Sequence, residues 1–312
     1  MHLKTLLLSA CVGAALTLTA ANAGTVRGIS DKITPMVPTG KGYGRPATPG
    51  ELADGRAVRY AKHTSGNGIS YHGGPLVLGT PNAYYIWYGN WSGNTATTIL
   101  TSMISAFGGS PYYNINTTYY DGSNLHLTNA VHYAGSTTDN YSQGTALSDA
   151  QIQTIVTSAI SSGALGPADP NGVYFVLTSA DVNETSGFCT SYCGWHTNGS
   201  ILGQTIKYSF VGNPDRCPSS CAAQTTSPNG NAGADGMASI ISHEFEETTS
   251  DPLGNAWYDT RGRENADKCA WTFGTESTAS NGSKYNITLG GNQYLIQQNW
   301  VNASGGYCSM SY

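Results

Sequence analysis

The chain has 312 residues, of which 11% are charged, and its formal net charge is −5. This length allows one large domain, or at most two. From residue 71 onward there are six Lys and Arg against 16 Asp and Glu, a balance that argues against nucleic acid as a partner, because phosphates require clustered basic residues.

The N-terminal residues have the order of features that defines a signal peptide. A basic residue, Lys4, precedes an apolar run over residues 6–18, and residues 21–23 (Ala-Asn-Ala) provide small side chains for cleavage. The apolar run is shorter than the roughly 20 residues that a membrane-spanning helix needs, and no later segment is apolar enough to span a bilayer. We therefore expect a signal peptide over residues 1–23, export from the cell and no membrane anchor.

Residues 24–70 are rich in Gly, Pro and basic side chains and show no sustained apolar periodicity. Such a segment cannot bury enough apolar surface to form a core of its own. It is predicted to be a flexible basic arm or a pro-segment, and residues 71–312 are predicted to form the globular domain.

The apolar pattern of the globular domain alternates between short strands and longer helices. Strands are predicted where apolar and aromatic residues form short runs or alternate, and helices where apolar residues recur every three or four positions. In chain order the predicted elements are a strand at 83–88, a helix at 95–107, a strand at 125–133, a helix at 148–162, strands at 172–177 and 205–211, and a helix at 233–249. This order predicts an α/β or α+β fold, in which a mixed β-sheet carries flanking helices.

The cysteines predict a disulfide-stabilised domain. Seven cysteines become six once Cys11 leaves with the signal peptide, and an even number in an exported protein favours three disulfide bonds. The spacing of two Cys-x-x-x-Cys pairs and two distant cysteines predicts the pairings Cys189–Cys193, Cys217–Cys221 and Cys269–Cys308. The alternative is a zinc site with four thiolate ligands, which the oxidising exterior of the cell disfavours.

Several segments of the domain together resemble one known family. They include 71–76 (YHGGPL), 86–89 (IWYG), 177–182 (LTSADV) and 210–213 (FVGN), in this order along the chain. The combination resembles the exordium family, also called the phosphate-induced proteins, over most of the chain from Tyr71 to the C-terminus. The resemblance implies an extracellular, cell-wall-associated protein, linked in plants to growth and cell expansion, and it brings no established reaction.

The last predicted helix carries ionisable residues that are suited to chemistry. His243 and Glu247 lie four positions apart, so both side chains project from the same flank of the helix and can reach one ion. Glu244 falls in the middle of the apolar stripe of this helix. A carboxylate buried there has to be paired, coordinated or protonated, because an isolated buried charge is too costly.

This segment resembles the zinc-peptidase helix His-Glu-x-x-His, with Glu247 in place of the second histidine. The resemblance, together with the order of strands and helices, implies a zincin-like core in which His243 and Glu247 are metal ligands and Glu244 is the general base. A third ligand is then required, and Glu264 is the first candidate, because gluzincin peptidases take a Glu from a later helix at a similar distance. The alternatives for this ligand are Asp251, Asp259 and Asp267.

One histidine and two carboxylates form a harder set of ligands than the usual zinc-peptidase site. We therefore expect a divalent metal ion as cofactor, with zinc as the first choice and calcium and manganese as alternatives. The sequence predicts a secreted, exordium-like protein with a zincin-like, metal-dependent hydrolase or peptidase site. Its expected substrate is an extracellular peptide or a cell-wall polymer.

A non-catalytic role is the alternative hypothesis. In that interpretation the protein binds cell-wall glycans or a surface partner outside the cell, and Glu244 accepts hydrogen bonds from a buried partner such as His243 or Arg261. His196, in the predicted cysteine-bearing loop 187–196, is as consistent with a hydrogen-bonding loop residue as with a ligand. The sequence gives no indication of the oligomeric state.

Overall fold

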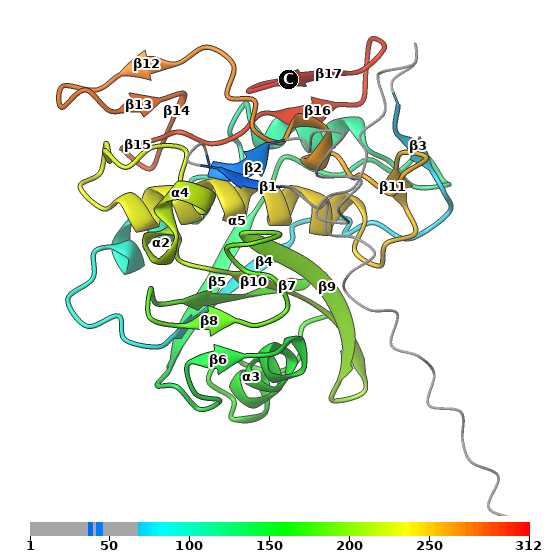
Figure 1. The fold of residues 1–312 in the computed structure, drawn as a ribbon. Helices are drawn as coiled ribbons and strands as arrows, with labels where there is room; N and C mark the ends of the chain where they lie inside the picture. Colours follow the sequence, from blue (N-terminus) through cyan, green and yellow to red (C-terminus); the bar gives the residue numbers. More distant parts are fainter. Residues whose placement is uncertain (1–36, 40–41, 46–67) are drawn as a thin grey trace, which may run out of the picture.

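The computed structural model describes residues 37–39, 42–45 and 68–312 (Figure 1). The predicted signal peptide and most of the predicted basic arm therefore lie outside the described residues, and both stay predictions. Within the range of the arm, β1 (Val37–Thr39) pairs antiparallel with β2 (Gly42–Arg45). None of the helices in the described part of the chain has the length and apolar character needed to cross a membrane.

A five-stranded mixed sheet organises the domain, with the strand order β5-β4-β7-β10-β9. The strands are β4 (Asn82–Tyr88), β5 (His132–Asp139), β7 (Gly172–Thr178), β9 (Gly194–Ile201) and β10 (Gln204–Val211). The first four in spatial order run parallel, and β9 runs antiparallel to β10 at one edge. Every residue of β7 is buried, which explains its continuous run of apolar side chains in place of an alternating pattern.

Helices cover both faces of this sheet (Figure 1). α2 (Ala96–Ser105) and α5 (Ala232–Ser250) lie on one face, and α3 (Asp149–Ser161) lies on the other. α5 is held between the sheet and the C-terminal hairpins, so its residues from Met237 to Ser250 are all buried. This enclosure accounts for a helix that has polar and charged residues on every side and still lies in the interior.

Short elements complete the domain, and β6 and β8 lie beside α3, across the sheet from α5 (Figure 1). Five short pairs of strands are formed: β3 with β11, β6 with β8, β12 with β13, β14 with β15 and β16 with β17. The bounds are β3 (Ser70–Tyr71), η2 (Tyr113–Thr118), β6 (Ala146–Leu147), β8 (Asn183–Glu184), η3 (Pro214–Arg216), α4 (Pro218–Cys221), β11 (Trp257–Tyr258), η4 (Asp267–Cys269), β12 (Ser277–Thr278), β13 (Lys284–Tyr285), β14 (Ile287–Leu289), β15 (Asn292–Tyr294), β16 (Asn299–Val301) and β17 (Tyr307–Ser309).

The mixed sheet with flanking helices confirms the predicted fold class, and the likeness to a zincin core stays a prediction. The predicted strand at 125–133 is wrong, because Leu125 is 55% exposed and the strand of the sheet begins only at His132. Alternation of apolar residues suggested pairing there, yet the segment forms only an isolated bridge between Tyr120 and His126. β5 itself is an edge strand, so its small polar residues need no apolar neighbours on both faces.

The disulfide pairing corrects two of the three predicted bonds. Cys269–Cys308 is confirmed, whereas the others are Cys189–Cys217 and Cys193–Cys221. Cys217 and Cys221 sit at the two ends of the single turn of α4, and Cβ atoms one turn apart are separated by about 5–6 Å. A disulfide requires about 3.8 Å between its Cβ atoms, so neither cysteine can reach the other and both bond across to the loop.

Proteolytic mapping of the unreduced protein tests this pairing. Chymotrypsin cleavage after Tyr192 separates Cys189 from Cys193, and we expect both fragments to remain linked to the fragment that contains Cys217 and Cys221 until a reductant is added. Mass spectrometry identifies the linked fragments. A digest in which the 217–221 fragment is free of the other two would contradict the crossed pairing.

Candidate functional site

The middle of α5 brings three ionisable side chains into the interior: His243, Glu244 and Glu247. The helix is fixed in place by its apolar residues, since Phe245 packs against Phe175 of β7 with ring centroids 6.1 Å apart. Aromatic contacts of this kind bury large areas and set the rotation of the helix about its axis. The ionisable side chains therefore have defined directions, toward β9 and toward η4.

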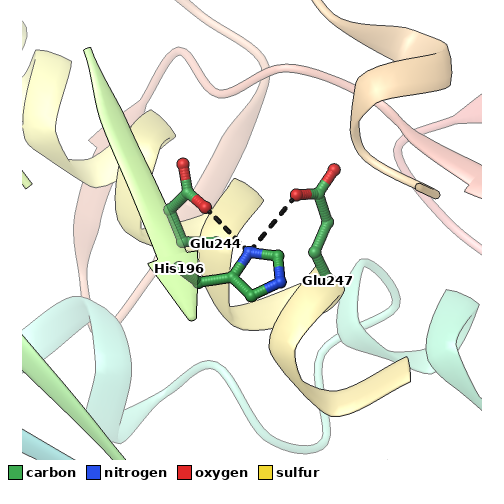
Figure 2. A group of neighbouring side chains, drawn as sticks. All are labelled: His196, Glu244 and Glu247. Carbon is green, nitrogen blue, oxygen red and sulfur yellow. Dashed lines mark hydrogen bonds and ion pairs between the residues drawn. The ribbon is translucent and has the colours of Figure 1, made fainter. Parts of the chain in front are cut away.

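His196 of β9 is the side chain that meets α5 from the sheet. Its Nδ1 lies 3.1 Å from Oε2 of Glu244 and 3.5 Å from Oε2 of Glu247 (Figure 2). Gly194, two positions earlier, permits the close approach, because a Cβ atom there would lie 2.5 Å from Cγ2 of Ile240 on α5. The strand and the helix are thus near enough for one imidazole to contact two carboxylates.

Sequence reasoning placed His196 in a loop and left its role open. β9 contains Gly194, Asn198 and Gly199, which are all depleted in strands. The turn that follows β9 was a better signal that His196 lies in a strand. Leu202 and Gly203 both have positive φ and form a two-residue connection between β9 and β10, so a hairpin with the predicted strand at 205–211 would have extended the pairing back to His196.

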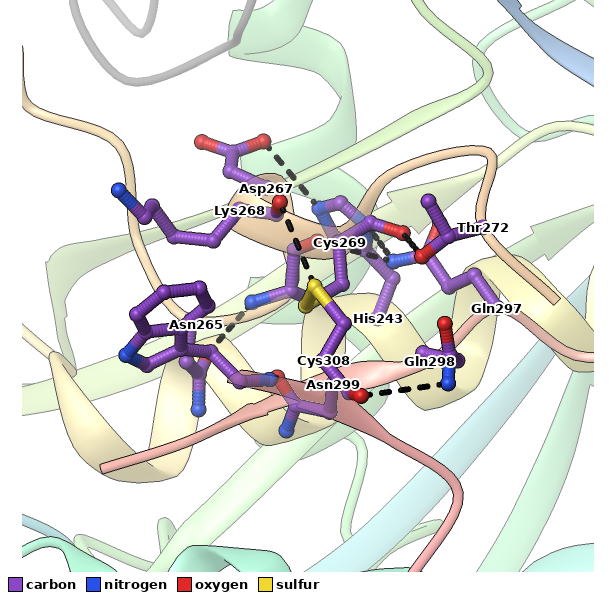
Figure 3. The surroundings of a disulfide bond; sticks show 12 residues. His243, Asn265, Asp267, Lys268, Cys269, Thr272, Gln297, Gln298, Asn299 and Cys308 are labelled. Carbon is purple, nitrogen blue, oxygen red and sulfur yellow. Dashed lines mark hydrogen bonds and ion pairs between the residues drawn. A yellow bond between two sulfur atoms is a disulfide. The ribbon is translucent and has the colours of Figure 1, made fainter. Parts of the chain in front are cut away.

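His243 forms a second group with Glu247 and Asp267. Its Nε2 lies 3.1 Å from Oε1 of Glu247. The same nitrogen lies 3.6 Å from Oδ1 of Asp267 (Figure 3). The backbone N–H of Asp267 donates to the same Glu247 oxygen at 2.9 Å. Asp267 begins η4, and the Cys269–Cys308 disulfide ties this short helix to β17.

The other acids that were considered as a third ligand have different surroundings. Oε2 of Glu264 lies 3.6 Å from Nε2 of His196. Asp251 accepts hydrogen bonds from the backbone N–H groups after α5, at 2.6 and 2.8 Å, and Asp259 pairs with Arg263 at 2.7 Å. Two of the four candidates therefore lie beside the imidazoles, Glu264 at His196 and Asp267 at His243.

Six ionisable side chains are thus buried together: His196, His243, Glu244, Glu247, Glu264 and Asp267. Burial raises the pKa of Glu247 to about 7 and the pKa of Glu264 well above its ordinary value. Burial alone would lower the pKa of His196, but the charges of Glu264 and Glu244 outweigh it and hold that pKa well above the ordinary value. Both kinds of group are shifted toward binding a proton, which indicates a shortage of positive charge.

The donor atoms fit a divalent cation. Among the described residues, the ion pairs of the four carboxylates are all to the two imidazoles. Among the atoms of these six side chains, three are buried and have no hydrogen-bond partner in the described part of the chain: Nε2 of His196 and both carboxylate oxygens of Glu264. The imidazole nitrogens lie 3.1 to 3.6 Å from carboxylate oxygens, which matches the roughly 3.4 Å expected between two ligands of a tetrahedral ion with bonds of about 2.1 Å. All donor atoms of a group lie within 4.8 Å of one another.

Comparison with known proteins identifies the family. The family model described as the phosphate-induced protein 1 conserved region matches residues 69–310. The chain belongs to this family. The resemblance to the exordium proteins that the sequence motifs suggested is thereby confirmed.

Plant members of the phosphate-induced protein 1 family are similar to this chain over most of its length. Protein EXORDIUM-like 5 of Arabidopsis thaliana is 33% identical over 272 residues, 74% of this chain and 75% of that protein. Protein EXORDIUM-like 3 of the same plant is 33% identical over 279 residues, 77% and 82% of the two chains. Protein PHOSPHATE-INDUCED 1 of Nicotiana tabacum is 26% identical over 219 residues, 61% and 67% of the two chains. No solved structure matches the chain.

Thermal unfolding tests whether the buried cluster of this exordium-like protein takes up a cation. After treatment with a chelator, added zinc should raise Tm, because an ion that binds only the folded state contributes about 2.7 kcal/mol at a free concentration 100 times its Kd. The Asp267→Asn variant should show a smaller rise, and Glu276→Gln, which changes an exposed acid, should match the wild type. An equal rise in Tm in Asp267→Asn and wild type, or no rise in either, would mean that no ion binds at His243.

Proposed function

We propose that this exordium-like protein is a secreted metal-dependent hydrolase whose cation is held by His243, Glu247 and Asp267. The single observation that carries the proposal is the convergence of one imidazole and two carboxylates beside Glu244. His243 and Glu247 lie on consecutive turns of the buried helix α5, and Asp267 comes from η4. The order of strands and helices ending in α5 is what the zincin resemblance implies. Three disulfides support a place outside the cell, because such bonds persist in oxidising compartments.

The imidazoles favour zinc or manganese over calcium, since calcium prefers oxygen ligands throughout. When bound, the ion supplies Lewis acidity and lowers the pKa of a water molecule. The side chains of the chain itself set up the proton transfer. Nδ1–H of His196 donates to Oε2 of Glu244, which fixes the carboxylate and leaves its other oxygen to accept a proton.

Gln297 is the residue that orients His243 toward the ion. Its side-chain amide contacts Nδ1 of His243, and its Oε1 is buried without a hydrogen-bond partner. A half-turn of the amide brings Oε1 to Nδ1–H, and this hydrogen bond leaves the lone pair of Nε2 directed at Glu247 and Asp267. Metal-binding histidines commonly donate their second N–H in this way. The substrate we propose is an extracellular peptide or a cell-wall polymer.

The enclosure of the cluster favours a second candidate function. Glu264 is 1% exposed and Glu247 is 2% exposed, so an ion held here also suits a purely structural role. In this case the protein is a non-catalytic extracellular module that binds cell-wall glycans or a partner, and the cation stabilises the fold. The two functions differ in what the carboxylate of Glu244 does.

The Glu244→Gln variant separates the two functions. Replacing the base by a neutral amide should lower the hydrolysis of a peptide library or of cell-wall polymers by about 100-fold or more, because general bases contribute about 10²–10⁴ to rates. The ion at His243 should be retained, as measured by elemental analysis at one equivalent of zinc. Glu276→Gln is the matched control and should behave as the wild type.

Other results would overturn the hydrolase assignment. Hydrolysis at the wild-type rate in Glu244→Gln would remove Glu244 from the reaction. A wild type that carries the ion, hydrolyses none of these substrates and retains its glycan binding in the variant would support the non-catalytic module.

A further inference from the structure

Glu247 directs its two carboxylate oxygens at two different imidazoles. Oε1 lies 3.1 Å from Nε2 of His243, and Oε2 lies 3.5 Å from Nδ1 of His196. Figures 2 and 3 show the two surroundings, with His196 between Glu244 and Glu247 in the first and Asp267 facing His243 in the second. The buried cluster therefore consists of two groups of three donors that share one residue.

One of these groups, which we call the His196 triad, consists of His196, Glu244 and Glu247. Its donor atoms all lie within 4.8 Å of one another. An independent feature lies on the other side of the His196 ring. Nε2 of His196 and both oxygens of Glu264 are buried, 3.6 Å apart at their closest, and have no hydrogen-bond partner. Unmet hydrogen-bonding capacity of this kind is costly in the interior. A cation on Nδ1 would leave the ring proton on Nε2, where it faces the unpartnered oxygens of Glu264.

The charge of the cluster exceeds what one divalent ion can balance. Four buried carboxylates, of Glu244, Glu247, Glu264 and Asp267, face two imidazoles. One divalent cation with neutral imidazoles leaves two negative charges uncompensated, whereas two divalent cations neutralise the cluster. Buried charges are stable only when paired or coordinated, so the doubly loaded state is the electrostatically balanced one.

We infer that the site binds two divalent cations, one at the His196 triad and one at His243, Glu247 and Asp267, and that Glu247 bridges them through its two oxygens. The inference rests on the proposed function for the cation at His243 and adds a second cation at His196. The bridging residue lies on one turn of α5, and the two imidazoles reach it from α5 itself and from β9. Sites with two metal ions are commonly held by such shared ligands.

The second cation should bind more weakly than the first. For Nδ1 of His196 to coordinate, it must give up the proton that it donates to Glu244, and the proton moves to Nε2, where Glu264 lies 3.6 Å away to accept it. Glu264 is therefore a positioning residue that fixes the tautomer of His196. Coordination also engages Glu244, so the second cation withdraws the proposed base and converts the site to an inactive form.

Manganese titration of the chelator-treated full chain tests the inference without a substrate. Calorimetry should give two Mn²⁺ per chain in the wild type, and electron paramagnetic resonance should show the signal of isolated Mn²⁺ replaced by that of a magnetically coupled pair. Glu244→Gln and Asp267→Asn should each retain one ion and lose the coupled signal. Glu247→Gln should weaken both binding steps at least tenfold, and Glu276→Gln should bind as the wild type does.

The outcomes are distinguishable. One Mn²⁺ per chain in the wild type, lost in Asp267→Asn and kept in Glu244→Gln, would overturn the second cation and leave the proposed function standing. Two uncoupled ions, or a Glu247→Gln variant that loses only one of them, would overturn the bridge. No bound Mn²⁺ in a folded wild type would overturn both the inference and the cation of the proposed function.

Discussion

The enclosed charge of α5 is the constraint on which the rest of this structure depends. One stretch of the helix carries His243, Glu244 and Glu247 into the interior, where Glu264 and Asp267 join them. Removing ions from water costs several kcal/mol each unless they are well compensated. Two imidazoles cannot compensate four carboxylates, so the cluster requires protons or cations. Some donor atoms of the cluster have no hydrogen-bond partner, and this favours cations over protons.

The surrounding fold holds this cluster from three directions. β9 supplies His196 from the sheet, η4 supplies Asp267 from the C-terminal part, and Gln297 contacts His243 from the segment before β16. Two disulfides lie next to these elements, since Cys193 directly precedes β9 and Cys269 ends η4. Cross-links and packing of this kind hold the side chains on these elements in defined directions.

The sequence predicted those features that depend on local pattern. α5 was predictable because its apolar residues recur at helical spacing, and β4, β7 and β10 were predictable because buried parallel strands are continuous apolar runs. The helical spacing of His243 and Glu247 also placed them together, and the structure has them 3.1 Å apart. Spacing along a regular element translates directly into distance.

Features that depend on contacts between elements were not predictable in the same way. His196 enters the cluster through the pairing of β9 with β10, which no local apolar pattern reveals. Glu264 and Asp267 are only three residues apart in an irregular segment, so sequence distance does not tell which of them faces which imidazole. The crossed bonds of Cys189 and Cys193 likewise follow from the packing of α4 against their loop.

Anomalous X-ray diffraction from crystals of the full chain grown with zinc is the most direct test of the central claim. Data collected on both sides of the zinc absorption edge locate the ion independently of any assumed chemistry. The account predicts an anomalous peak within bonding distance of Nε2 of His243 and of the carboxylates of Glu247 and Asp267. An ordered cluster with the same side-chain positions and no anomalous peak would contradict it, and would mean that protons alone balance the buried acids.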